Sequence, residues 1–367
     1  MNQEIIISTE VKQQLSNIYK KHQVSKVLVV CDNAFPYLQT HEEYLDMDIS
    51  YVLFDRFTPN PLYEDVVEGV NVFHEQKCDA ILAIGGGSAI DVAKCIKLFS
   101  SMDKEKLYLE QEYAENDVIL IAIPTTSGTG SESTRYAVVY YEGKKQSVTH
   151  ESIIPKYAIL DYRNLNTLPI YQKKCTMMDA FCQSIESWWS VNATKESREY
   201  ARKALTDIVK YMDAYLANTK EGNTNMLVAA NYAGRAICIS QTTAAHAMSY
   251  KLTSLYKIPH GRAAFMCLPY IWQYMWDNIQ NETEENQNNL TEIFTEIAKT
   301  LGCKTVPEAI RYVLALNEKL FIEDAVELKM EDIDVLTASV NPVRLSNNPV
   351  TLSKETLREL YRKIIEV

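Results

Sequence analysis

The sequence predicts an α/β domain built on a parallel sheet, followed by an all-α domain. In the first half, short apolar runs alternate with segments of helical periodicity, a pattern typical of βαβ units. After Pro169, segments with a period near 3.6 residues follow one another to the end of the chain. A chain of 367 residues is long enough for two domains with separate cores. We expect residues 1–165 to form the first domain and residues 166–367 the second.

Four apolar runs in the first half predict buried strands, because each is short and rich in branched side chains. Two helices are expected among them, one over 62–77 and one beginning at Ala89. The predicted strands are 27–30, 51–54, 80–84 and 118–123.

The second half has no comparable strand signal, and its apolar residues recur at helical spacing. The polar run 278–289 is expected to be a solvated loop or the end of a helix. The predicted helices are 171–191, 195–217, 224–256, 264–279, 285–301, 305–317, 330–340 and 353–366.

The composition excludes several classes of protein. With 37 Lys and Arg against 48 Asp and Glu, the net charge is −11, which argues against nucleic acid as a partner. No apolar run reaches the length of a membrane span, so no membrane partner is expected. The eight cysteines form no CxxC pair, and the N-terminus has no signal-peptide pattern. We therefore expect a cytoplasmic protein.

A cluster of glycines follows the predicted strand at 80–84 and leads into a helical pattern. Glycine lets the backbone approach a phosphate, and the N–H groups at a helix start favour negative charge. Five of the eleven glycines fall here and in the loop 124–132, which indicates that backbone freedom is required there. The motif is not GxGxxG, and a tight strand–helix turn is the alternative. Its residues are Gly85, Gly86, Gly87, Ser88 and Asp91.

A second loop, 124–132, follows the next predicted strand and is dense in hydroxyl groups and glycine. Ligands of open α/β sheets bind at the carboxyl ends of the strands, where both loops lie. Together the loops predict a dinucleotide site, and a plain capped loop is the alternative. The candidate hydroxyl residues are Thr125, Thr126 and Thr129.

Four residues of the second half suit a metal site. Asp179 and Gln183 lie four apart in a helical pattern, so both project from one face. His246 and His260 are fourteen residues apart, about 21 Å in a continuous helix, so the chain must bend back for both to bind one ion. The Pro259-His260-Gly261 segment provides such a break. The alternatives are a structural Asp that pairs with Lys or caps a helix, and histidines satisfied in the core.

The order and spacing of these motifs resemble those of the iron-containing (group III) alcohol dehydrogenases, with their glycerol dehydrogenase and dehydroquinate synthase relatives. GGGSAIDVAK, PTTSGTGSE, the Asp179 helix and the two histidines carry the resemblance over almost the whole chain. It implies a Rossmann-like domain followed by a helical metal-binding domain, the dehydroquinate synthase-like fold. It also implies an active site in the cleft between the domains and a homo-oligomer.

The resemblance implies a set of nucleotide contacts. Asp32 matches the residue that accepts hydrogen bonds from the adenosine ribose, and a carboxylate there favours NAD(H) over NADP(H). The remaining cofactor contacts implied by position are Asn60, Gly85, Gly86, Gly87, Ser88, Asp91, Thr125, Thr126, Thr129 and Lys145.

The resemblance also implies a divalent metal, Fe²⁺ or Zn²⁺, bound by Asp179, His246 and His260. The family usually has a fourth ligand, a His, where this chain has Gln183, whose amide oxygen is a poorer ligand. Many relatives carry a further His where this chain has Tyr250, and we expect Tyr250 or a metal-bound water to supply the catalytic proton.

Gln183 and the segment 344–349 (RLSNNP) resemble the short members that act on phosphonates. The implied reaction is reduction of phosphonoacetaldehyde to 2-hydroxyethylphosphonate. The alternatives are dehydrogenation of an uncharged alcohol or polyol (butanol, 1,3-propanediol or glycerol type), a dehydroquinate synthase-like lyase, or a nucleotide-binding protein without catalysis. Cations for the phosphonate must be local in an acidic chain, and each could instead be a structural or surface charge. The candidates are Arg135, Arg235, Lys251, Arg262 and Arg344.

Overall fold

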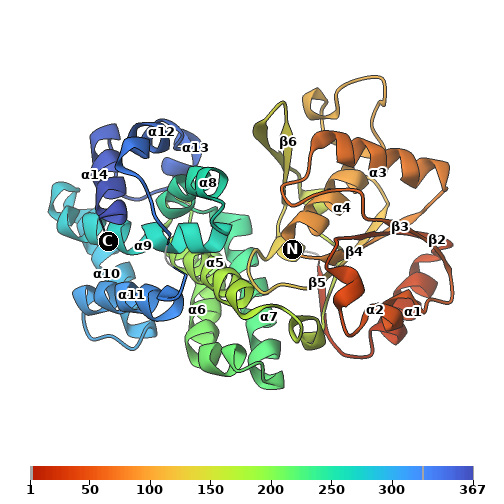
Figure 1. Cartoon of the computed structure of the whole chain (residues 1–367), viewed down its shortest axis with the longest axis horizontal. Coiled ribbons are helices and arrows are strands. Elements are labelled where there is room, and N and C mark those ends of the chain that lie inside the picture. Colours follow the sequence, from red (N-terminus) through yellow and green to blue (C-terminus); the bar gives the residue numbers. More distant parts are fainter. Residues whose placement is uncertain (1–2, 325, 367) are drawn as a thin grey trace. The chain divides into compact units, whose positions relative to one another are not determined.

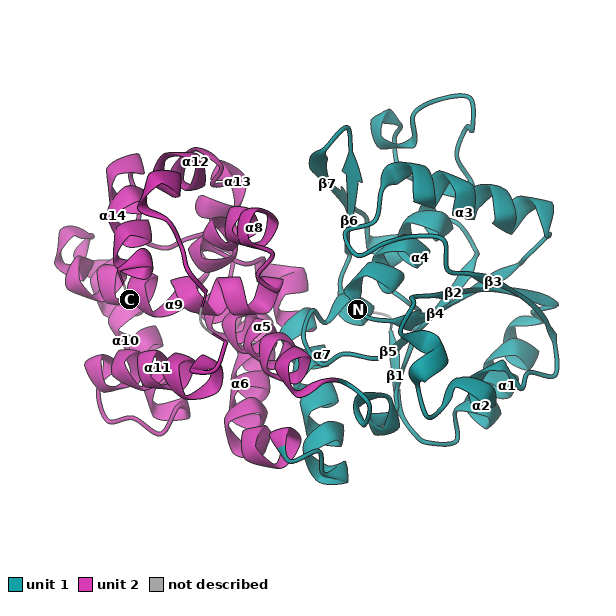
Figure 2. Ribbon diagram, in the orientation of Figure 1, with its two compact units in different colours: residues 1–168, 217–234 teal, residues 169–216, 235–367 magenta. Residues whose placement is uncertain are grey.

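The computed structural model describes residues 3–324 and 326–366. The chain divides into two compact units (Figure 2), Met1–Leu168 with Ala217–Gly234, and Pro169–Leu216 with Arg235–Val367. The sequence analysis placed a single boundary between 165 and 166. In the structure, residues 217–234, which we had expected in the second domain, belong to the first unit. They pack there because Gly234 lies against Gly130, where an added Cβ would be 2.5 Å from the Gly130 oxygen.

The first unit contains a six-stranded parallel sheet, which confirms the predicted α/β class (Figure 1). All four predicted strands are present, and two further strands were missed, β1 (Glu4–Ile7) and β8 (Tyr157–Leu160). Both are four residues long. The sheet order is β1 (Glu4–Ile7), β8 (Tyr157–Leu160), β5 (Ile119–Pro124), β4 (Ala80–Gly85), β2 (Lys26–Cys31) and β3 (Ser50–Phe54).

Helices cover both faces of this sheet, which explains why its central strands are continuously apolar. In β2, Leu28 and Val30 belong to the core under α3 (Tyr63–Glu75) and α4 (Gly87–Phe99). Val27 and Val29 of the same strand belong to the core under α1 (Val11–His22) and α2 (His41–Leu45). Each such side chain is fully buried and contributes about 1.5–3 kcal/mol to folding. The layers hold the carboxyl ends of β4 and β5 in fixed positions.

A two-stranded hairpin, β6 (Tyr136–Tyr141) and β7 (Lys144–Thr149), was also missed by the sequence analysis. Its turn residues Glu142 and Gly143 both have positive φ, 49° and 72°. Two such residues match the twist of an antiparallel pair, so this turn closes the hairpin. The Glu-Gly pair is a weaker sequence signal than Asn-Gly or Asp-Gly.

The second unit is helical, as predicted. The expected helix 224–256 is wrong as a single element, because α7 (Lys220–Ser240) ends before Gln241, whose φ is 63°. The helix 264–279 begins earlier, at His260, and the short α13 was not predicted. The helices after α7 are α8 (Ala244–Tyr256), α9 (His260–Asp277), α10 (Glu284–Thr300), α11 (Val306–Phe321), α12 (Ile333–Ala338), α13 (Pro342–Leu345) and α14 (Lys354–Ile365).

The core of the second unit surrounds α5 (Ile170–Trp189), which follows the boundary and precedes α6 (Lys195–Leu216). Trp189 contacts the rings of Trp272 and Phe294, with both centroid separations 5.8 Å. The C-terminal three-quarters of α5 is buried, so its polar residues need partners inside the protein. In the ranges 3–324 and 326–366, no helix combines the length and apolar character needed to cross a membrane.

Candidate metal centre and nucleotide loops

The glycine loop joins β4 to α4 in the first unit. Asp32, at the end of β2, accepts hydrogen bonds from the Gly86 N–H (3.2 Å) and the Ala34 N–H (3.0 Å). A Cβ on Gly85 would lie 2.7 Å from Asp32 Oδ2 and 2.6 Å from Ala89 Cβ. No larger residue fits at position 85 without moving the carboxylate or the helix. The structure therefore places Asp32 directly beside the glycine loop.

The hydroxyl loop after β5 lies against the glycine loop. A Cβ on Gly87 would be 3.0 Å from Thr129 Cγ2, and one on Gly86 would be 3.4 Å from Thr126 Cγ2. The Thr125 N–H donates to the Gly85 carbonyl oxygen at 3.0 Å. Ser88, in the first turn of α4, is half-buried. The two loops thus form one surface at the carboxyl ends of neighbouring strands.

Asp91 contacts the protein's own donors. Its carboxylate accepts hydrogen bonds from Ser131 Oγ (2.6 Å) and the Val138 N–H (2.9 Å), and burial raises its pKa despite the Lys94 charge. Lys94, which is 0% exposed, donates to the Thr134 hydroxyl at 3.0 Å and to the Tyr136 carbonyl at 2.8 Å. These groups fix the hairpin and the hydroxyl loop to α4. A direct contact between Asp91 and a nucleotide stays a prediction.

Asn60 and Lys145 both lie near Tyr140 of the β6–β7 hairpin, Asn60 next to the segment that Tyr140 contacts and Lys145 on the neighbouring strand. Asn60 is exposed with a φ of 60°, and the next residue, Pro61, accepts a hydrogen bond from the Tyr140 N–H at 2.8 Å. Lys145 is paired with Tyr140 across the hairpin and is also exposed. Its charge acts on Asp91. The hairpin therefore brings both predicted cofactor residues to one region.

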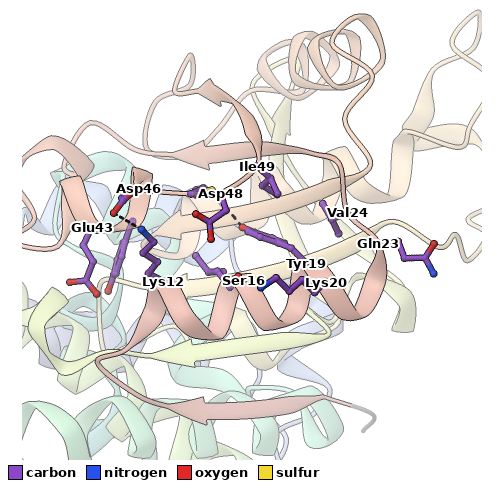
Figure 3. Close-up of a pocket in the computed structure, with 13 residues that line it drawn as sticks. Lys12, Ser16, Tyr19, Lys20, Gln23, Val24, Glu43, Asp46, Asp48 and Ile49 are labelled. Carbon is purple, nitrogen blue, oxygen red and sulfur yellow. Dashed lines mark hydrogen bonds and ion pairs between the residues drawn. The ribbon is translucent and has the colours of Figure 1, made fainter.

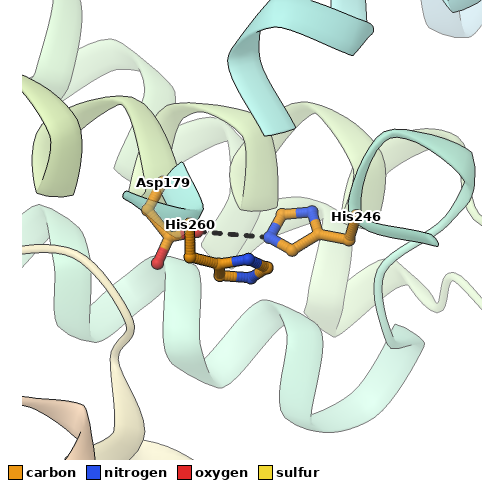
Figure 4. A group of neighbouring side chains, drawn as sticks. All are labelled: Asp179, His246 and His260. Atoms are coloured by element: carbon orange, nitrogen blue, oxygen red, sulfur yellow. Dashed lines mark hydrogen bonds and ion pairs between the residues drawn. The ribbon is translucent and has the colours of Figure 1, made fainter. Parts of the chain in front are cut away.

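Three residues from three helices of the second unit meet in one cluster (Figure 4). Candidate ligand atoms of Asp179, His246 and His260 all lie within 4.8 Å of one another, and His246 Nε2 is 3.2 Å from Asp179 Oδ1. The chain bends back between the histidines, as the spacing predicted, because α8 ends at Lys257 with a φ of 59° and α9 begins after Pro259. One carboxylate and two imidazoles form a donor set suited to Zn²⁺ or Fe²⁺.

Gly261 allows α9 to approach α5 at this cluster. A Cβ on Gly261 would clash with the Cys175 carbonyl oxygen and would lie 2.5 Å from Asp179 Cβ. Both groups belong to α5, whose backbone is held by its own hydrogen bonds. The position next to His260 must therefore be glycine for His260 to reach Asp179.

Glu186, which the sequence analysis did not consider, supports His246. Its Oε2 is hydrogen bonded to His246 Nδ1. Its Oε1 accepts from the Thr243 N–H (3.0 Å), the Thr243 hydroxyl (2.9 Å) and the His246 N–H (3.2 Å). The available signal was an acidic residue seven positions after Asp179, on the same face of an apolar helix.

The charges in the cluster oppose the effect of burial. Burial alone would lower the pKa of His246, but the carboxylates of Glu186 and Asp179 raise it to about 9. Burial alone would raise the pKa of Asp179 and of Glu186, but hydrogen bonds and the positive charge of the imidazoles lower both. The cluster thus holds two carboxylates ionised in a buried place, where a cation is favoured.

Gln183 and Tyr250 border the three-residue cluster. Gln183 is 4% exposed and forms a side-chain hydrogen bond with Asp179 that helps lower the Asp179 pKa. The Tyr250 ring stacks on His260, with a centroid separation of 5.4 Å and an interplanar angle of 8°. Burial raises the pKa of Tyr250, so the phenol keeps its proton at neutral pH. Both residues lie where the sequence analysis expected them, and their roles remain predictions.

Comparison with known proteins gives the family. The model described as iron-containing alcohol dehydrogenase matches residues 2–162, and the model of the C-terminal part of that family matches residues 174–365. The chain belongs to the iron-containing alcohol dehydrogenase family. It is therefore an oxidoreductase of the alcohol dehydrogenase and aldehyde reductase type, which confirms the family and fold that the motifs predicted.

Several known proteins resemble the chain over nearly its full length. An alcohol dehydrogenase of Thermococcus barophilus is 28% identical over 95% of this chain and 94% of its own. The lactaldehyde reductase of Escherichia coli K12 is also 28% identical, with the same coverage. A sulfoacetaldehyde reductase of Bifidobacterium kashiwanohense, solved with NAD⁺, has a TM-score of 0.88 at 24% identity over 100% of this chain and 98% of its own.

In this family member, the predicted substrate cations have different surroundings. Arg344 donates to Gln241 Oε1 at 2.8 Å, and its charge lowers the pKa of Tyr250 against the effect of burial. Arg262 is 5% exposed and donates to the Tyr171 hydroxyl at 3.0 Å. The other candidates are Arg235, which lies 5.8 Å from the Tyr200 ring centroid, Lys251, which is half-buried on α8, and Arg135, which pairs with Glu151 at 2.5 Å.

A separate cavity of about 290 Å³ lies in the first unit between α1, α2 and the segment 46–49 (Figure 3). Its lining includes the ion pair of Lys12 with Asp46, 2.6 Å apart. None of the residues predicted to bind a nucleotide or a metal lines it. The cavity is therefore distinct from both candidate sites.

Proposed function

We propose that this oxidoreductase uses NADH and one divalent metal ion to reduce phosphonoacetaldehyde to 2-hydroxyethylphosphonate. The observation that carries the proposal is the cluster of Asp179, His246 and His260, with Tyr250 stacked on His260. NADH is preferred to NADPH in this proposal, because the Asp32 carboxylate beside the glycine loop would repel a 2′-phosphate. Activity with the two coenzymes, compared as kcat/KM, tests that preference.

In this proposal, separate residues bind the metal ion, bind the dinucleotide and donate the proton. Asp179, His246 and His260 would hold the cation, which supplies Lewis-acid polarisation of the aldehyde carbonyl. The loops at Gly85–Gly87 and Thr125–Thr129 would hold and orient the dinucleotide, whose nicotinamide would supply the hydride for the reduction. Tyr250 donates the proton to the carbonyl oxygen, because its phenol is protonated at neutral pH and lies against His260.

The phosphonate part of the proposal is supported by the position of Arg344. A dianionic group needs a cation, and a guanidinium binds phosphonate oxygens in bidentate fashion. Among the cations predicted from the sequence, the charge of Arg344 acts on Tyr250 and lowers its pKa. It lies in α13, within the RLSNNP segment that resembles the phosphonate-active members.

An uncharged short-chain alcohol or polyol is the second candidate substrate. One observation favours it directly, since Arg344 already donates to Gln241 within the protein. The relatives point the same way in their names, which include an alcohol dehydrogenase and a lactaldehyde reductase. In this case the same cluster and loops act on a substrate that needs no cation.

The ratio of kcat/KM for phosphonoacetaldehyde to that for propanal, a neutral aldehyde of equal chain length, separates the two candidates. Replacing Arg344 with Gln should lower the value for phosphonoacetaldehyde about 100-fold or more and change the propanal value little, because only the charged substrate loses a partner. Arg358→Gln is the matched control, since Arg358 on α14 forms an ion pair with Asp334 and its side chain is 44% exposed. Equal losses on both substrates in Arg344→Gln would favour the uncharged substrate.

A further inference from the structure

Glu186 is a buried carboxylate in direct contact with a candidate metal ligand, His246, and the proposed chemistry does not use it. It is 0% exposed and lies on α5, two turns after Asp179. A buried carboxylate without partners is costly, and Glu186 is hydrogen bonded through both oxygens. Its four partners all belong to Thr243 and His246. Both oxygens of the side chain therefore bind residues at the start of α8.

The two oxygens act on different parts of α8. Oε1 accepts hydrogen bonds from the Thr243 N–H and the His246 N–H, two of the donors that a helix start leaves without intrahelical partners. Thr243 provides no cap of its own, and its hydroxyl instead donates to Glu186 and accepts from Trp189 Nε1 at 2.9 Å. Glu186 thus caps α8 from a neighbouring helix, at the end where the helix dipole favours negative charge.

The second oxygen acts on the His246 ring. A carboxylate is only an acceptor, so the hydrogen bond between Oε2 and Nδ1 requires the proton on Nδ1. In this structure Nε2 lies 3.2 Å from the Asp179 carboxylate, so it donates there too and the ring carries both protons. When a cation displaces the Nε2 proton, the Nδ1 proton stays on the Glu186 side and the Nε2 lone pair faces the metal ion. Ring nitrogens bound to metals commonly have their other N–H fixed in this way.

We propose that Glu186 is a positioning residue that fixes the tautomer and orientation of the His246 ring, so that Nε2 faces Asp179 and His260. This role rests on the proposed function, because it requires a metal ion at the cluster, whereas the Glu186 contacts are present in the structure itself. It also gives a reason for the break between α7 and α8. A new helix start near Thr243 provides the free N–H groups that Glu186 accepts from, next to the His246 ring that it orients.

The substitution Glu186→Gln separates the two actions of this side chain. The amide oxygen must face the three donors of Thr243 and His246, so the amide NH₂ must face His246 Nδ1. The helix cap is then retained, but Nδ1 becomes an acceptor and the proton moves to Nε2. A protonated Nε2 cannot bind a metal ion.

Two measurements test the proposal. Long-range ¹H–¹⁵N NMR of metal-free protein under alkaline conditions should show the proton of His246 on Nδ1 in the wild type and on Nε2 in Glu186→Gln. Chelator competition should show Zn²⁺ bound about 10–100-fold more weakly by the variant. Ser187→Ala is the matched control, because that neighbouring buried hydroxyl bonds only to its own helix at Ser184. An unchanged tautomer, or Zn²⁺ affinity within twofold of the wild type, overturns the proposal.

A second variant covers the case in which Glu186→Gln does not fold. Thr243→Ala removes one donor to Oε1 but leaves Nδ1 bound to Oε2. It should lower the melting temperature, keep the wild-type tautomer and keep the Zn²⁺ affinity within about threefold. A changed tautomer in Thr243→Ala would mean that the helix start orients the ring, which contradicts the role of Glu186. The tautomer is read without metal, so its result stands apart from any failure of the proposed metal chemistry.

Discussion

The nucleotide loops of the first unit and the metal cluster of the second are built in opposite ways. Each loop is one continuous segment at the end of a strand, and parallel pairing of β4 with β5 brings the two together. The metal cluster takes one residue from each of three helices, and long-range packing sets its geometry. The loops therefore depend on local backbone freedom, while the cluster depends on how closely α5, α8 and α9 approach. Substitutions should affect one region and leave the other unchanged.

The largest expected effect is that of His246→Ala. Loss of one of three ligands should abolish metal retention and lower kcat/KM by about 10³-fold or more, because the carbonyl is no longer polarised. Metal analysis of the purified variant and steady-state kinetics measure both losses. NADH affinity, measured by fluorescence titration, should stay within about twofold. Full activity in this variant would refute the assignment of the metal cluster.

Gly261→Ala should damage the cluster without removing any ligand. The added Cβ meets the Cys175 carbonyl and Asp179 Cβ, so α9 must move away from α5 and take His260 with it. Overpacking of this kind costs about 1–3 kcal/mol of folding free energy, and we expect Zn²⁺ to bind about 10–100-fold more weakly. Thermal melting and chelator competition report the two effects. Unchanged metal affinity would show that the close approach at Gly261 does not set the position of His260.

Gly85→Ala is the reciprocal change in the first unit. The added Cβ would lie 2.7 Å from Asp32 Oδ2 and 2.6 Å from Ala89 Cβ, which forces the loop away from Asp32. NADH should bind about 10-fold more weakly, equal to about 1.4 kcal/mol, and metal content should be that of the wild type. A parallel loss of metal would contradict the independence of the two regions.

Gln183→His should produce a change no larger than that of Gly85→Ala, and a gain in affinity where the other variants show losses. An imidazole at this buried position beside Asp179 adds a better ligand than an amide, so Zn²⁺ should bind about 10-fold more tightly. Gln172→His is the control, because Gln172 lies on the same helix but is exposed. Equal affinities of Gln183→His and the wild type would indicate that residue 183 does not reach the metal.

The sequence carried the features that are local in the chain. The strands at 27–30 and 80–84 were predictable because central strands of a parallel sheet are apolar on both faces. The glycine and hydroxyl loops were predictable because each directly follows such a strand. The bend between His246 and His260 followed from helix geometry together with the hypothesis that both bind one metal ion.

The features that were missed depend on distant contacts. The end of α7 at Gln241 was hidden because the apolar period continues through it, and the start of α8 is fixed by Glu186, which lies more than fifty residues earlier. Glu186 itself resembles any acidic residue of a helix until its partners are known. The move of residues 217–234 to the first unit depends on the contact between Gly130 and Gly234, which no periodicity reveals.

Helix α5 carries both Asp179 and Glu186, two turns apart on one rigid rod. When thermal motion displaces α5, the ligand Asp179 and the residue that holds the His246 ring, Glu186, move in the same direction. The distance between the Asp179 carboxylate and His246 Nε2 should therefore vary less than the distance between α5 and α8. Because both residues lie on one helix, the coordination of the cation would be preserved while the surrounding helices move.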